Sequence, residues 1–175
     1  NVSLTVTDPE ENPTGLNFNN DGTKMYVVGL TGDAVFQYTL TAGFDLSTAS
    51  YDNVSFSVSS QDTVPEGMTF NADGTKLFIV GRTGDSVYQY SLSTAFNVST
   101  MSYDDVSFSV SGQDINPRAV EFNSSGTKMY IVGATSDAVH QYSTGIDTYP
   151  TASPITVNGL TNGTSYTFNV WAINA

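Results

Sequence analysis

The sequence predicts an all-β fold made of one four-stranded antiparallel sheet that is repeated along the chain. The clearest observation is a period of 52 residues, seen in the identical places of Pro13, Pro65 and Pro117 in three similar segments. Within each segment, short apolar runs are separated by Asp-Gly and Gly-Asp pairs, which favour tight turns between antiparallel strands. No stretch of useful length has a helical period. A repeat of this length predicts an array, a solenoid or a closed ring of sheets.

Each repeat is expected to contain four strands. In the first repeat they are GLNF, KMYVVGL, AVFQYTL and, after a longer loop, VSFSV at 54–58. The second strand is apolar on both faces, as expected where it is covered from both sides, whereas VSFSV alternates and suits an outer edge. The strand that follows the proline is therefore expected to be innermost. Four antiparallel strands per repeat of this length are typical of a β-propeller blade.

The shared motif P-x-G-x-x-F-N-x-D-G-T-K-M-Y-V-V-G…D-x-V-x-Q-Y resembles the YVTN and lactonase-like β-propeller repeats. The resemblance covers residues 1–144, in repeats at 1–52, 53–104 and 105–144. Its connectors are similar to those of arrays in bacterial surface proteins and phage structural proteins. The resemblance implies three propeller-type blades, and it says little about activity because propellers serve many unrelated functions.

Residues 145–175 leave the repeat and resemble part of a fibronectin type III domain. The stretch GLTNGTSYTFNVWAINA carries that family's alternating pattern. The resemblance implies a tyrosine corner, in which the hydroxyl of Tyr166 bonds to the backbone near Leu160. Because the segment is too short for a whole sandwich, we expect a β-hairpin that packs on the blades, on another chain or on sequence of the protein beyond residues 1–175.

The charge balance excludes several classes of partner. Five Lys and Arg residues stand against 17 Asp and Glu residues, so the formal net charge is −12. This charge disfavours nucleic acids and anionic membranes, and the apolar runs are too short for membrane insertion. The chain has no cysteine, hence no disulfide or thiolate metal site. A low pI with many Ser, Thr, Asn and Gly residues predicts an extracellular location, on a cell surface or a virion surface.

No catalytic or metal-binding residue is predicted. The single histidine, His140, stands where the other repeats have Phe36 and Tyr88, so we expect it to pack rather than to catalyse. No cofactor is expected, although a surface calcium ion in the acidic loops is a weak alternative. The recurring acids before the third strand of each repeat are expected to be turn residues. They are Asp33, Asp85 and Asp137.

A ligand is expected to bind where the outer strand of one blade connects to the innermost strand of the next. These connections gather on one face around the axis of a propeller, and loops on a rigid scaffold often carry function. Their side chains suit a sugar. The predicted ligand-binding residues are Gln61, Asp62, Glu66, Gln113, Asp114 and Arg118.

The two ends of the array are expected to be incomplete. Val2, Leu4 and Val6 form the apolar face of an outer strand that has no preceding blade, and the third repeat lacks a VSFSV strand of its own. Strand donation between chains would satisfy both ends and would give either a dimer of six blades or a head-to-tail filament. A piece of a longer protein would have the same two ends, and this alternative stays open.

These observations predict a non-enzymatic structural or adhesive module of an extracellular assembly, such as a surface protein, a filament or a phage fibre. Its partners would be copies of itself, other chains of the assembly or glycans. A carbohydrate-binding, lectin-like propeller is one alternative, and a secreted hydrolase of the lactonase type is another. The identity of the ligand and the number of blades in the complete assembly stay open.

Overall fold

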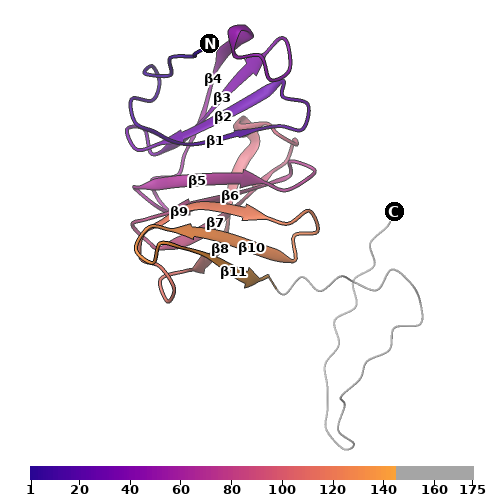
Figure 1. Cartoon of the computed structure of the whole chain (residues 1–175). Coiled ribbons are helices and arrows are strands. Elements are labelled where there is room, and N and C mark those ends of the chain that lie inside the picture. The colour runs from indigo at the N-terminus through magenta and orange to yellow at the C-terminus, as the bar shows by residue number, and fades with distance from the viewer. Residues whose placement is uncertain (145–175) are drawn as a thin grey trace, which may run out of the picture.

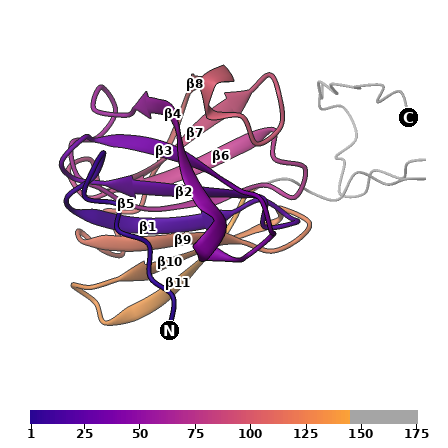
Figure 2. The same cartoon turned by 90° about the horizontal axis from the view of Figure 1, so that it is seen from above.

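The computed structural model describes residues 1–144, which form three antiparallel sheets that follow one another along the array (Figures 1 and 2). The predicted fibronectin-like hairpin, with Leu160 and Tyr166, lies outside the described residues. The first sheet contains β1 (Pro13–Phe18), β2 (Lys24–Gly29), β3 (Ala34–Leu40) and β4 (Ala49–Ser57). The second contains β5 (Pro65–Phe70), β6 (Lys76–Gly81), β7 (Ser86–Leu92) and β8 (Met101–Ser109). The third contains β9 (Pro117–Phe122), β10 (Lys128–Gly133) and β11 (Ala138–Ser143).

The turns between strands have the chemistry that the sequence predicts. Glycines of the Asp-Gly and Ser-Gly pairs have positive φ, for example 71° at Gly22, a conformation that costs glycine little. The recurring acids before β3, β7 and β11 also lie in turns with positive φ, which confirms their expected position. These acids are Asp33, Asp85 and Asp137.

The outer strands begin earlier than predicted. β4 begins at Ala49 and not at Val54, because Tyr51 packs against Tyr38 of β3, with ring centroids 5.3 Å apart. A bulge at Asn53, with φ of 56°, joins this part to the alternating part of the strand. The second sheet repeats the arrangement. Before each outer strand lies one turn of 3-10 helix, at Leu46–Thr48 and at Val98–Thr100.

The strands that follow the prolines are innermost, as predicted. β5 lies between β1 and β9, and the three run side by side (Figure 1). Their backbones approach so closely that a Cβ atom on Gly67 would lie 2.8 Å from the carbonyl oxygen of Arg118. The Thr14 hydroxyl donates a hydrogen bond of 2.7 Å to the carbonyl oxygen of Pro65. Small residues on these strands therefore hold neighbouring sheets together.

Apolar side chains fill the spaces between successive sheets. Between the first and second sheets, Tyr26, Val28 and Val35 belong to one cluster with Leu77 and Ile79. A second cluster joins the second and third sheets. The middle strands of the first two sheets are thus buried on both faces, as their sequence predicts. The prediction was wrong for β10 of the third sheet, where Val132 is 44% exposed. The members of the second cluster are Val80, Val87, Val110, Val120, Met129 and Ile131.

Residues 1–6 are not part of a strand in this structure. Leu4 and Val6 are half-buried against the first sheet, where they pack on the cluster that includes Val27 and Tyr38. No sheet precedes the first one in the described chain, so these residues have no strand edge to pair with. The predicted assembly strand of Val2, Leu4 and Val6 is therefore not paired: Leu4 and Val6 pack on their own sheet, and Val2 is 60% exposed. Within residues 1–144, no helix has the length and apolar character needed to cross a membrane.

Candidate functional site

The candidate binding surface is the end of the array at which the innermost strands begin, which we call the rim. Antiparallel pairing places the turn after β2 beside the start of β1, since Pro13 pairs with Gly29, and Pro65 likewise pairs with Gly81. The connections at 58–64 and 110–116 lead into the same end. The rim therefore collects loops from all three sheets, as the sequence predicts.

Asp62 ties two of these loops together. It is 2% exposed, and it accepts hydrogen bonds from the backbone N–H groups of Val64 (2.8 Å), Thr83 (3.2 Å) and Gly84 (2.8 Å). The connection into β5 is thereby joined to the turn after β6. A carboxylate that is buried and occupied in this way stabilises the fold. Asp62 was predicted to contact a ligand, and its surroundings instead give it a structural role.

Asp114 does the same in the third sheet. Its carboxylate accepts from the backbone N–H groups of Asn116 (2.6 Å) and Ser136 (2.7 Å) and from the Ser136 hydroxyl (2.6 Å). Burial alone would raise the pKa of Asp114, but these hydrogen bonds outweigh it and lower the pKa to about 2. Like Asp62, Asp114 is committed to the fold rather than presented to a ligand.

Glu10 is the corresponding carboxylate of the first sheet, and the sequence analysis missed it. It is fully buried and accepts from the backbone N–H groups of Asn12 (2.6 Å), Thr31 (3.0 Å) and Gly32 (3.0 Å). The available signal was its position, because an acid lies three residues before each of the three repeated prolines. The change from aspartate to glutamate concealed that pattern.

Gln61 and Gln113 accept hydrogen bonds from buried or half-buried tyrosines. Gln61 Oε1 is 3.3 Å from the hydroxyl of Tyr90, and Gln113 Oε1 is 3.2 Å from the hydroxyl of Tyr142. Burial raises the pKa of both tyrosines. The first sheet has Pro9 at the corresponding place, and the buried hydroxyl of Tyr38 has no hydrogen-bond partner there. The two predicted glutamines thus also contribute to the fold.

Glu66 and Arg118, which the sequence predicted together, form an ion pair across two sheets. Arg118 Nη1 lies 2.7 Å from Glu66 Oε1, and Arg82 Nε lies 3.1 Å from the same oxygen. Glu66 is buried, whereas the side chains of Arg82 and Arg118 are 42% and 43% exposed. Because each guanidinium has five N–H donors, the exposed parts of both can bind an anionic group. Arg82, from the turn after β6, was not foreseen.

A second polar row lies further along the innermost strands. The Thr69 hydroxyl donates to the carboxylate of Glu121 at 3.2 Å and 3.3 Å, and the Asn17 amide donates to the Met68 carbonyl oxygen at 3.5 Å. Glu121 is exposed and Thr69 is buried. Among residues 1–144, no cluster of three or more His, Cys, Asp or Glu side chains is arranged to hold a metal ion.

His140 contacts a serine in an order that does not match a catalytic triad. Its Nε2 atom lies 2.8 Å from the Ser136 hydroxyl, and that hydroxyl bonds to Asp114. In a triad, the aspartate holds the histidine so that the histidine can take the proton from serine. Here Ser136 lies between His140 and Asp114, and its hydroxyl donates a hydrogen bond to the Asp114 carboxylate. The arrangement therefore orients the imidazole but does not activate the serine.

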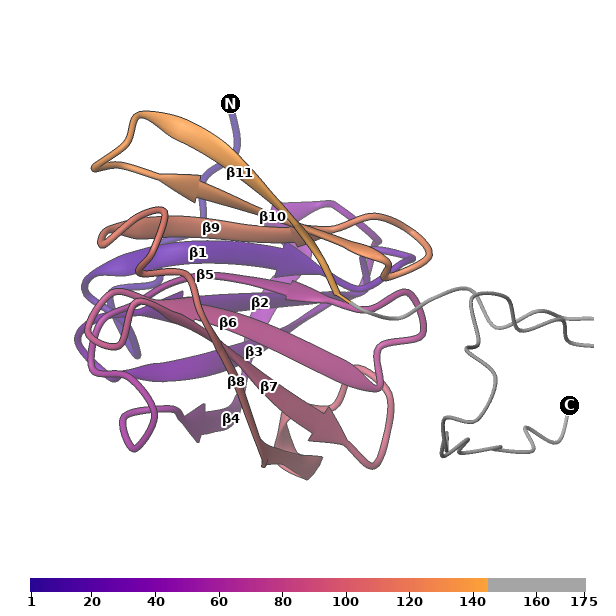
Figure 3. The same ribbon diagram turned by 90° about the horizontal axis from the view of Figure 1, so that it is seen from below.

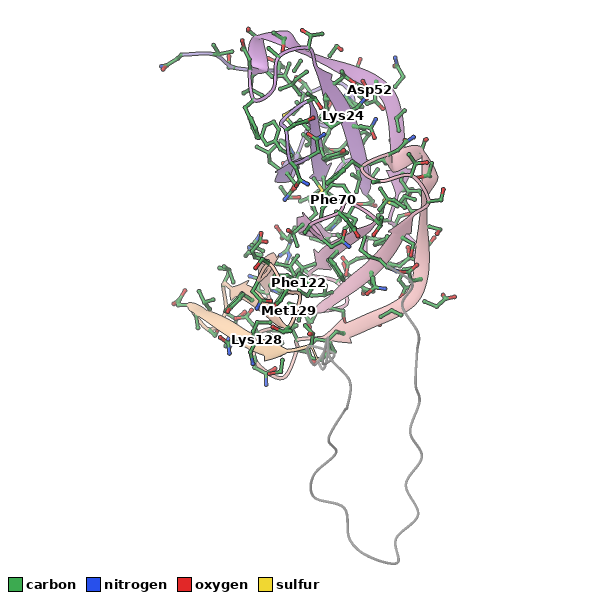
Figure 4. All side chains as sticks on the ribbon, turned by 90° about the vertical axis from the view of Figure 1, so that its right-hand side faces the viewer. Lys24, Asp52, Phe70, Phe122, Lys128 and Met129 are labelled. Atoms are coloured by element: carbon green, nitrogen blue, oxygen red, sulfur yellow. The ribbon has the colours of Figure 1, made fainter. Side chains whose placement is uncertain are left out.

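A cleft of about 840 Å³ lies between the second and third sheets. Phe70 of the second sheet and Phe122 and Met129 of the third line it (Figure 4). The corresponding space between the first and second sheets is filled by the connector before β8. There Phe96 packs on Phe70, with ring centroids 5.3 Å apart, and the Val98 N–H donates a hydrogen bond of 2.9 Å to Gln37 Oε1. The cleft thus has the size of a ligand pocket. It lies at the position that corresponds to the connector before β8 in the first junction.

Charged pairs also tie the strands within the first and second sheets. Lys24 Nζ lies 2.9 Å from Asp52 on the outer strand, and the two side chains point toward one another (Figure 4). Lys76 and Asp104 repeat the pair at 2.7 Å. Most of the recurring charges are thus used inside the fold, which leaves the two arginines as the exposed cations at the rim.

Comparison with solved structures places this architecture among known folds. No family model matches the chain, and no curated protein does so. A candidate 6-phosphogluconolactonase from Bacteroides uniformis superposes with a TM-score of 0.57 at 10% identity, over 78% of this chain and 38% of the other. A β-propeller domain from Myceliophteria thermophila superposes with a TM-score of 0.52 at 11% identity, over 75% of this chain and 40% of the other. The chain has a propeller-type fold. The periplasmic gluconolactonase of Pseudomonas aeruginosa superposes with a TM-score of 0.55 at 15% identity, over 75% of this chain and 35% of the other.

These comparisons correct one prediction. The chain was predicted not to be an enzyme, yet two of the three similar structures are named as lactonases. The absence of a recognisable catalytic residue in the sequence was therefore too weak a reason to exclude enzymatic activity. At such low identity the likeness shows the fold alone. The chain spans less than half the length of each solved structure described above.

Proposed function

We propose that the chain is a structural and adhesive module of an extracellular assembly and that its rim contacts the ligand. The observation that carries the proposal is the cluster of Arg82, Arg118 and Glu66. It joins two sheets through one buried carboxylate, and it leaves two half-exposed guanidinium groups where loops from all three sheets meet. The other recurring polar side chains of the rim are occupied within the fold.

The chemistry of this cluster favours a glycan that carries a single carboxylate. Guanidinium groups bind carboxylates through paired hydrogen bonds, and the cluster has one positive charge in excess. The net charge of −12 of the whole chain opposes a polyanion. A sugar with one acidic group would meet the local positive charge without the repulsion that a polyanion would meet.

Binding to an array of acidic and neutral glycans tests the proposal. We expect retention on glycans with a carboxylate, and a decrease of about tenfold or more in Arg118→Gln, because a charge-assisted hydrogen bond is removed. Arg82 stays on Glu66 in that variant, so the buried carboxylate keeps a partner. Lys128→Gln, which changes a lysine that bonds to Ser143, is the matched control. If no glycan is retained, the adhesive proposal is wrong; retention of neutral glycans alone, unchanged in Arg118→Gln, would favour the lectin-like alternative.

A hydrolase of the lactonase type is a second candidate, which the names of two similar structures favour. Glu121 is the carboxylate that could activate a water molecule, since it is exposed on an innermost strand while Glu66 is occupied by two arginines. We expect acid release from gluconolactone above the uncatalysed rate, decreased about tenfold or more in Glu121→Gln. Titration at constant pH measures it, and a rate equal to that of buffer would exclude this candidate.

A further inference from the structure

We propose that the third sheet of one copy docks on the first sheet of a second copy, head to tail, and thereby repeats the first of the two junctions that the chain makes internally. The inference rests on the proposed function in one respect, that the chain works within an assembly, and it names the partner. It does not depend on what the rim binds.

The third sheet exposes a face that is covered in the other two. Val132 and Val139 are 44% and 67% exposed. In the first sheet the corresponding residues are Val28 and Val35, each 0% exposed, and in the second sheet they are Val80 and Val87, 0% and 4% exposed. In both cases the next sheet covers them. The free face of the third sheet is therefore shaped to receive one more sheet of this kind.

The first sheet exposes the residues that such a face would cover. Leu16 is 56% exposed, whereas the corresponding Met68 is 5% exposed and shares a cluster with Val28 and Val35. Phe44 is 61% exposed, whereas Phe96 is half-buried at the first junction. The exposed apolar side chains of the first sheet thus correspond to residues that, at the internal junction, cover the counterparts of Val132 and Val139.

The hydrogen bonds of the internal junction have counterparts at the two ends as well. At the first junction, between the first and second sheets, the Tyr26 hydroxyl donates a hydrogen bond of 2.6 Å to the carbonyl oxygen of Phe96. The Val98 N–H donates one of 2.9 Å to Gln37 Oε1. The third sheet has the same donor and acceptor side chains. On docking, Tyr130 would donate to the Phe44 carbonyl oxygen, and Gln141 would accept from Leu46 N–H; these four residues hold the corresponding positions of the repeat.

The N-terminal segment would supply the missing outer strand. In the first sheet, Val35 of β3 pairs with Phe56 of β4. The same register places Leu4 opposite Val139 on β11, which is an edge strand of the third sheet within the described residues (Figure 3). Leu4 and Val6 already pack on the sheet that would follow. Addition of a strand to an exposed edge gives backbone hydrogen bonds along its length, and it would complete the assembly strand of Val2, Leu4 and Val6.

The occupant is a second copy because both halves of the junction are present in one chain. A head-to-tail contact closes into a ring when the rotation between subunits allows it, and otherwise it grows into a filament. Two copies would bring six sheets together, which is within the usual range of propellers. Either form would satisfy both ends of the array.

Light scattering of the intact chain over a range of concentrations tests the docking. We expect a mass above that of the monomer, either a dimer or a series of larger species. Val139→Asp and Leu16→Asp should each raise the dissociation constant at least about a hundredfold, because each would bury an unpaired charge in the junction. Both residues are exposed in one copy, so these variants should fold. Ile115→Asp, at a residue 61% exposed on a rim connection, is the matched control and should keep the mass of the unaltered chain.

Mixing the two variants distinguishes this contact from a symmetric one. A Val139→Asp copy keeps its first sheet intact, and a Leu16→Asp copy keeps its third sheet intact. Together they should form one junction and give a pair, although each alone stays a monomer. A monomer at all concentrations, or a mixture that forms no pair, would overturn the docking. Glycan binding is measured separately: a monomer that binds glycans overturns only the docking, and an oligomer that binds none overturns only the adhesive function.

Discussion

Replacement of Asp62 by alanine is expected to lower the free energy of unfolding by about 3 kcal/mol, because it leaves three backbone N–H groups without their acceptor. These groups belong to Val64, Thr83 and Gly84, on two separate loops of the rim. The carboxylate holds the connection into β5 against the turn after β6. Its loss should therefore loosen both the second sheet and its contact with the first. Urea unfolding followed by far-UV circular dichroism measures the change.

The matched control is Asp73→Ala. Asp73 accepts hydrogen bonds from the N–H and the hydroxyl of Thr75 within one exposed turn, so its loss should cost less than about 1 kcal/mol. Asp62→Glu should recover part of the stability, since Glu10 makes the same three kinds of contact in the first sheet. If Asp62→Ala and Asp73→Ala change the unfolding midpoint equally, Asp62 does not tie the loops together.

The repeat made the fold predictable. Prolines at a fixed spacing defined the innermost strands, and turn glycines with positive φ defined the ends of the hairpins, because both residues restrict the backbone locally. The apolar second strand of each repeat indicated burial from both sides. The clusters between sheets confirm this for the first two repeats, whereas Val132 in the third is 44% exposed. The early start of β4 was missed, since residues 49–51 are stabilised by the contact of Tyr51 with Tyr38 and carry no strand pattern of their own.

The candidate site was less predictable, because its parts meet only through tertiary contacts. The sequence located the rim and chose Glu66 and Arg118, which do contact each other. It did not indicate that Asp62 and Asp114 are buried, since an acid in a loop has the same local sequence whether it faces water or backbone N–H groups. Arg82 was missed because the other sheets have Leu30 and Ala134 at its place, so the repeat gave no signal.

The cleft between the second and third sheets was missed for a different reason. It lies at the place that corresponds to the connector of the first junction, and the described residues of the third sheet end before that connector. A comparison of the repeats shows which strands recur, but it does not show how much space lies between two sheets. The change after Tyr142, where the repeat pattern ends, was the only local sign.

Packing between sheets predicts opposite outcomes for the same substitution at two corresponding valines. Val80→Asp should lower the free energy of unfolding by more than about 4 kcal/mol, because it places a charge without a partner in the apolar cluster between the second and third sheets. Val80 is 0% exposed there and belongs to the cluster with Val120 and Ile131. Val132→Asp puts the same charge at the same place of the next repeat, where the side chain is 44% exposed, and it should cost about 1 kcal/mol or less.

The comparison is made in dilute protein, so that any docking between copies contributes equally little to both variants. Urea midpoints and the slopes of the transitions separate a loss of stability from a change in compactness. Equal tolerance of both substitutions would mean that the second and third sheets do not share an apolar interface. Equal destabilisation would mean that Val132 is covered even in a single copy. A large effect at Val80 alone would establish that the third repeat has an open sheet face where the second repeat is covered, and that open face is the one on which a further sheet would dock.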